Sequence, residues 1–96
     1  LKPEARKDDI LARSLLLAET QGYNKITRTQ ICEAAGVSDP VLNYHFGTMA
    51  QFRRDLMRRA IKTENLRVIA QGVVAADPQA QKMPNELRQR ALASVF

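Results

Sequence analysis

The 96-residue chain has little of what disulfide-bonded, zinc-bound or membrane-spanning proteins require. Its one cysteine, Cys32, cannot form an internal disulfide, and its one histidine, His45, leaves too few ligands for a tetrahedral zinc site. Its apolar runs, such as Leu15 to Ala18, are at most four residues long, whereas a membrane-spanning helix needs ~20. We therefore expect no metal ion, no membrane contact and a location in the reducing cytoplasm.

Patterns that carry catalysis are missing as well. The sequence contains no Gly-rich phosphate loop, no nucleophile with a plausible base and no pair of carboxylates in an apolar setting. Glycine and proline, with four residues each, are too scarce for a collagen-like or low-complexity chain. We therefore predict a folded protein that is not an enzyme and that binds no cofactor.

Positive charge is concentrated in the middle of the chain. Fifteen Lys and Arg residues against ten Asp and Glu residues give a net charge of +5. Residues 1–37 (six basic, five acidic) and residues 63–96 (four basic, three acidic) contribute +1 each, so residues 38–62 supply +3. The basic residues of this middle stretch are Arg53, Arg54, Arg58, Arg59 and Lys62. This charge favours a polyanionic partner, although basic residues spread around a helix are often only a solvated face.

Start and stop signals predict a first helix from Pro3 to Gln21. A proline suits the first helical turn, acidic residues follow it, and Gly22 stands where the helix would end. Small or apolar side chains recur at helical spacing and predict one inner face, formed by Ile10, Ser14, Leu17 and Ala18.

Two shorter helices follow, joined by a tight turn. Thr27 and Gln30 have the spacing of a capping box, which predicts a helix over residues 27–35 that ends at Gly36. The next helix is expected to run from its cap at Ser38 to Phe46. Two short helices with a glycine in the turn between them predict a helix-turn-helix.

The second half of the chain is also expected to be helical. The capping-box spacing recurs at Thr48 and Gln51 and predicts a long fourth helix over residues 49–74. Its predicted inner stripe consists of Phe52, Leu56, Ala60, Leu66, Ile69 and Val73. Pro84 is a further start signal, so a short helix is expected from Asn85 to Phe96.

No segment alternates apolar and polar residues for long enough to predict a strand. The predicted fold class is therefore all-α: a three-helix helix-turn-helix domain, a long fourth helix and a short C-terminal helical segment. We expect residues 1–62 to form the helix-turn-helix domain and residues 63–96 to form a helical extension that mediates dimerisation.

A set of residues at fixed spacing runs through the first half of the chain. It comprises Ile10, Ser14, Leu17, Ala18, Gly22-Tyr23, Ile26-Thr27, Ile31-Cys32, Ala35-Gly36-Val37-Ser38, Leu42 and His45-Phe46. This set, over about residues 8–58, resembles the DNA-binding domain of the tetracycline-repressor (TetR) family. The resemblance implies a dimeric transcriptional repressor whose third helix enters the major groove.

Three features differ from the usual pattern of that family. Asn43 stands where a Tyr is usual, and Thr48-Met49 stands where a Lys is usual. Family members also continue into a ligand-sensing domain, whereas about 38 residues follow residue 58 here, too few to enclose an ordinary ligand cavity. We therefore expect a short form with no small-molecule effector.

The resemblance and the side-chain chemistry together predict the residues that contact double-stranded DNA. The base-reading candidates lie opposite the apolar side of the third helix: Asp39, Pro40, Asn43 and Tyr44. The phosphate-binding candidates lie at or near helix starts: Lys25, Thr27, Arg28, Thr29, His45 and Thr48. The alternative for each is a structural role, as a solvated side chain, a helix cap or a packing residue. For Cys32 we expect a buried small hydrophobe.

Two hypotheses for the function remain open. In the first, the chain represses transcription as a homodimer on an inverted repeat, with the dimer contacts supplied by Leu66, Ile69, Val73, Leu87, Leu92 and Val95. In the second, it is a helix-turn-helix adaptor that binds protein or packages nucleic acid without reading sequence. The effect of Asn43→Ala on binding to a preferred site distinguishes them.

Overall fold

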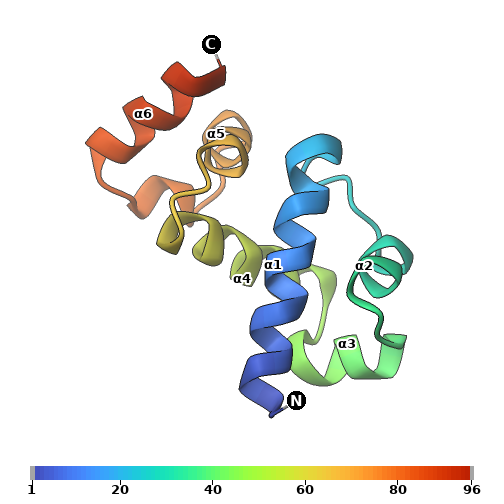
Figure 1. Cartoon of the computed structure of the whole chain (residues 1–96). Coiled ribbons are helices and arrows are strands. Elements are labelled where there is room, and N and C mark those ends of the chain that lie inside the picture. Colours follow the sequence, from blue (N-terminus) through green and yellow to red (C-terminus); the bar gives the residue numbers. More distant parts are fainter. Residues whose placement is uncertain (1, 96) are drawn as a thin grey trace.

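Helices account for all the regular secondary structure in residues 2–95, which are the residues that the computed structural model describes (Figure 1). They are α1 (Pro3–Gln21), α2 (Arg28–Ala35), α3 (Asp39–Phe46), α4 (Met49–Lys62), α5 (Leu66–Val74), the short 3-10 helix η1 (Ala80–Lys82) and α6 (Asn85–Val95). The all-α class is confirmed. The predicted end of the last helix at Phe96 lies outside the described residues.

Helix α1 forms one wall of the core. Ile10, Ser14 and Ala18 are fully buried, and the Ser14 hydroxyl donates a hydrogen bond to the Ile10 carbonyl oxygen at 2.7 Å. This bond satisfies the polar atom of a side chain that would otherwise be costly to bury. Leu17, which was expected on the inner face, is only partly buried, and Leu11 and Leu15 lie inside together with the first three.

Helix caps fix where α2 and α4 begin. In each predicted capping box the threonine hydroxyl accepts from the backbone N–H three residues later, at 3.2 Å for both Thr27–Gln30 and Thr48–Gln51. Each glutamine side chain in turn accepts from the threonine's own backbone N–H. The two predicted capping boxes are therefore confirmed, and so is the cap of α3, where the Ser38 hydroxyl accepts from a backbone N–H.

The expected long helix over residues 49–74 is wrong, because the chain turns sharply between α4 and α5. Glu64 adopts a left-handed conformation with φ 54°, and the Asn65 N–H donates to the Ala60 carbonyl oxygen at 2.8 Å. This pattern is a Schellman motif, which ends a helix. The Asn65 side chain then accepts from the Val68 N–H at 3.2 Å and so caps α5.

Helix α5 packs closely against α4. A Cβ atom placed on Gly72 would lie 2.5 Å from the Met57 Cε atom, so a larger residue there would require the end of the Met57 side chain to shift. Ile69 and Leu87 are buried here by the chain itself. The expectation that these two residues supply a dimer surface is therefore wrong, whereas Val74 (69% exposed) and Val95 (43% exposed) face outward.

The helices place α3 at the opposite end of the molecule from α6 (Figure 1). Helix α3 lies beside the N-terminal part of α1, and its Phe46 ring packs edge-on against Phe52 of α4 with centroids 4.9 Å apart. This arrangement of the helices leaves the outer face of α3 uncovered.

None of the helices within residues 2–95 is both long enough and apolar enough to cross a membrane.

Removing the cap of α5 tests the break between α4 and α5. We expect Asn65→Ala to lower the free energy of unfolding by about 1 kcal/mol, because the Val68 N–H loses its acceptor. Urea unfolding followed by circular dichroism measures this loss. Asn65→Asp keeps an acceptor oxygen and should be nearly neutral; an equal loss in both variants would contradict the capping role.

Candidate nucleic-acid interface

Helix α3 has one buried side and one exposed side. Leu42 is fully buried and Phe46 is 5% exposed, and these two side chains hold the helix to the core. The four predicted base-reading residues are all exposed: Asp39, Pro40, Asn43 and Tyr44. The structure therefore brings them together on one open face of a single helix. The major groove of DNA is wide enough to admit one helix.

Two aromatic rings lie in the C-terminal half of α3. The Tyr44 ring is 78% exposed and meets the His45 ring edge-on with centroids 5.1 Å apart. His45 is half-buried and lines a hollow of about 320 Å³ together with Pro3 and Arg6 of α1. Arg6 was not predicted as a site residue, because only the packing of α1 beside α3 brings it to this face.

The other phosphate-binding candidates lie at the starts of α2 and α4. Lys25, Thr27, Thr29 and Thr48 are exposed, and the oxygens of Thr27 and Thr48 serve as caps. Capping uses the hydroxyl oxygen as an acceptor and leaves the positive end of the helix dipole directed outward. These positions can therefore attract an anion even though two of the hydroxyls are already engaged.

Arg28 differs from the other candidates because its guanidinium group is already paired. Its Nε atom donates to Asp39 Oδ1 at 2.7 Å, and its Nη1 atom donates to the Gly47 carbonyl oxygen at 3.2 Å. The side chain is 29% exposed, whereas that of Asp39 is 65% exposed. Arg28 and Asp39, which were both predicted to contact DNA, therefore bind each other.

Two of the five basic residues on α4, Arg58 and Arg59, are engaged in ion pairs. Arg59 donates to Asp8 of α1 at 2.7 Å, and this hydrogen bond lowers the pKa of the Asp8 carboxyl group from its ordinary value. Arg58 lies 3.9 Å from Asp55, which also lies 3.8 Å from Lys7. The Arg59–Asp8 and Lys7–Asp55 contacts join α4 to α1, so Arg59 has a structural role.

Cys32 packs against the core, but it is half-buried rather than buried as expected. Burial, together with the negative charge of Asp39, raises the pKa of its thiol group. The described part of the chain, residues 2–95, contains no group of three His, Cys, Asp or Glu residues placed to hold a metal ion.

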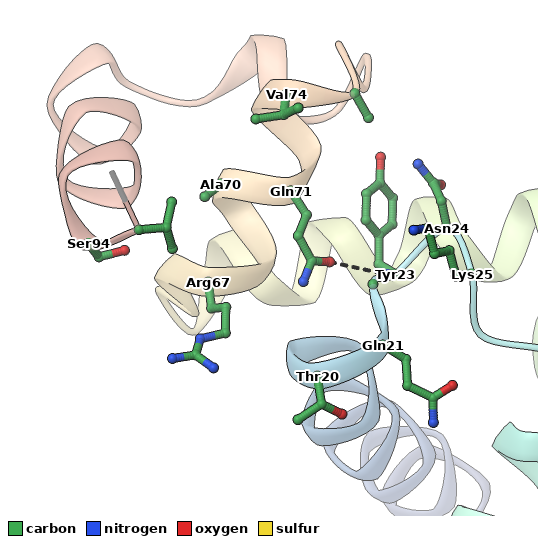
Figure 2. A pocket seen from close by; sticks show the side chains of 13 residues that line it. Thr20, Gln21, Tyr23, Asn24, Lys25, Arg67, Ala70, Gln71, Val74 and Ser94 are labelled. Carbon is green, nitrogen blue, oxygen red and sulfur yellow. Dashed lines mark hydrogen bonds between the residues drawn. The ribbon is translucent and has the colours of Figure 1, made fainter.

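A groove of about 780 Å³ lies away from α3, between the end of α1 and the helices α5 and α6 (Figure 2). Gln71 of α5 spans its base: the side-chain oxygen accepts from the Tyr23 N–H at 2.8 Å, and the side-chain nitrogen donates to the Ala18 carbonyl oxygen at 2.9 Å. The Tyr23 hydroxyl donates to Asp77 at 2.8 Å. This network ties the segment that leads into α2 to the C-terminal helices.

Helix α3 is open on one side, and a tight turn joins it to the capped helix α2. Cationic and helix-terminal groups lie on either side of α3. This arrangement defines a helix-turn-helix DNA-binding domain. Comparison with known families identifies the type: residues 10–56 match the family of bacterial regulatory proteins called the tetR family. Residues 10–56 are therefore a tetR-family helix-turn-helix domain, which makes the chain a DNA-binding regulator of transcription. No curated protein and no solved structure gives a significant match.

The hydroxyl of Tyr23 provides a test of the network beside the groove. Burial and the hydrogen bond to Asp77 raise the pKa of Tyr23 to about 12. An unfolded tyrosine ionises near pH 10, so the folded chain holds this proton more tightly. The resulting stabilisation is complete below about pH 10 and is lost as the pH rises toward 12.

We expect Tyr23→Phe to lower the free energy of unfolding by about 1 kcal/mol at neutral pH, because the hydrogen bond is lost. The difference from the wild type should shrink above about pH 10, where the wild-type chain loses this stabilisation. Urea unfolding at a series of pH values measures both effects. Tyr44→Phe, which removes the hydroxyl of an exposed ring, is the control. A difference in unfolding free energy between the wild type and Tyr23→Phe that stays constant with pH would contradict the raised pKa of Tyr23.

Proposed function

We propose that the chain represses transcription by binding as a homodimer to an inverted repeat in double-stranded DNA. The observation that carries this proposal is the open face of α3, where the four predicted base-reading residues are exposed together while Leu42 and Phe46 are buried. Such a face can enter the major groove without any rearrangement of the core. Occupation of a promoter by the dimer would exclude the polymerase.

Each exposed residue of α3 has a chemical reason to read bases. The Asn43 amide can donate to N7 and accept from N6 of adenine, and such a bidentate contact discriminates by about 1–3 kcal/mol. Pro40 can pack against a thymine methyl group, and Tyr44 can reach a base edge or a phosphate oxygen. Asp39, which repels phosphate, would accept from cytosine N4 if it contacted a base directly.

Phosphates on either side of the groove would be held by residues at the neighbouring helix starts. The proposed contacts are Lys25, Thr27 and Thr29 around the start of α2, Thr48 at the start of α4, and His45 at the end of α3. Helix N-termini suit this task because their free N–H groups and dipoles favour an anion whatever the sequence. Arg6, beside His45, is a further cationic candidate.

We propose that residues 1–62 bind DNA and that residues 63–96 supply the dimer contact. Val74 and Val95 expose apolar surface at the end of the molecule away from α3. A two-fold dimer would then place two copies of α3 on one face of the duplex, with half-sites about 34 Å apart or at a multiple of that spacing.

Selection of bound fragments from random duplex DNA, carried out at two salt concentrations, tests the proposal. A recovered palindrome would support both sequence reading and two-fold symmetry. A steep salt dependence without any motif would contradict sequence reading and favour the adaptor hypothesis, because counterion release alone then accounts for the binding.

Asn43→Ala should weaken binding to the selected duplex by about 1–3 kcal/mol, between fivefold and 150-fold, and leave binding to random duplex unchanged. Fluorescence anisotropy with both duplexes measures the two affinities. Asn85→Ala, which removes an exposed amide at the start of α6, is the matched control and should change neither affinity. Equal losses on both duplexes would show that Asn43 does not read sequence.

A further inference from the structure

We propose that Arg28 is a positioning residue for sequence recognition: through Asp39 and Gly47 it holds α3 in its reading orientation, and it binds no phosphate itself. This inference rests on the proposed function, in which α3 reads bases. It assigns to Arg28 a role that differs from that of the other residues at the helix starts.

The contacts of Arg28 reach both ends of α3. Asp39, which accepts from Nε at 2.7 Å, is the first residue of α3, and Gly47, which accepts from Nη1 at 3.2 Å, follows its last residue. The guanidinium group is planar and its N–H groups have fixed directions. One rigid group from α2 therefore fixes the two ends of α3 relative to each other and to α2.

Helix α3 needs such a restraint because only two of its side chains anchor it in the core. Only Leu42 and Phe46 of its eight residues are buried. Two side chains on one side of a helix define a line of contact, about which the helix can still rock. The Arg28 contacts lie at the two ends of α3 and oppose that motion, and rocking would displace Asn43 and Tyr44 together.

The charges at this contact also argue against phosphate binding by Arg28. The carboxylate of Asp39 is 65% exposed and on the face that would meet DNA, and Arg28 compensates its negative charge. The ion pair adds no net charge to that face. Counterion release depends on the number of phosphates that the protein neutralises, and an internally neutralised pair adds nothing to this number.

The double variant Arg28→Gln/Asp39→Asn tests the proposal, because it removes the ion pair and leaves the net charge unchanged. The matched control is Arg13→Gln/Asp9→Asn, which removes an exposed ion pair of 3.0 Å contained within α1. Three quantities are measured on the full chain: amide hydrogen exchange of α3 without DNA, the ratio of affinities for selected and random duplex, and the salt dependence of binding.

In the double variant we expect faster exchange at the amides of α3. We also expect the preference for the selected duplex to fall about fivefold, which corresponds to the loss of one partly exposed ion pair. The slope of log affinity against log salt should stay the same. The control variant should match the wild type in all three measurements. Asp39→Asn alone should show a smaller change in the same direction, and it serves as the test if the double variant unfolds.

A slope that is shallower by about 0.9 per protomer in the double variant, with the preference unchanged, would show that Arg28 binds a phosphate and would overturn the proposal. Unchanged exchange at the amides of α3 would overturn it as well, even if the preference falls, because Asp39 is itself a base-reading candidate. If the wild-type chain prefers no duplex, the proposed function fails. The exchange measurement then still decides whether the ion pair orders α3.

Discussion

The fold depends on one constraint: α3 has only eight residues and cannot be stable by itself. A helix of about two turns does not offset the cost of its nucleation in water, so its conformation comes from the groups around it. Leu42 and Phe46 enter the core, and Phe46 meets Phe52 of α4 edge-on. The rest of the molecule can be understood as the support that presents this short helix.

Local hydrogen-bonding signals were predictable because their partners lie three to five residues apart. The capping boxes at Thr27 and Thr48 and the stop at Gly36 follow directly from side-chain type and spacing. The turn after α4 was missed because Glu64 occupies a left-handed position that usually requires glycine. Ala76 does the same after α5, where the Asp77 N–H donates to the Gly72 carbonyl oxygen at 2.9 Å.

The open face of α3 could be predicted from the positions of its two apolar residues. The partners of the charged residues could not, because they are distant in the sequence: Arg28 pairs with Asp39, 11 residues away, and Arg59 pairs with Asp8, 51 residues away. Sequence alone shows that a basic side chain is present. Whether it meets DNA or another part of the protein depends on distances that only the packed helices determine.

The side chain of Gln71 has a practical consequence for anyone who divides this chain. Its oxygen accepts from the backbone N–H of Tyr23 (Figure 2), its nitrogen donates to the Ala18 carbonyl oxygen near the end of α1, and Asp77 accepts from the Tyr23 hydroxyl. A fragment cut after residue 62 would leave the N–H and the hydroxyl of the buried Tyr23 without their acceptors, whereas the Ala18 carbonyl oxygen would keep its bond from the Gly22 N–H. Transfer of the helix-turn-helix domain to a new scaffold therefore requires α5 and the turn that follows it as well.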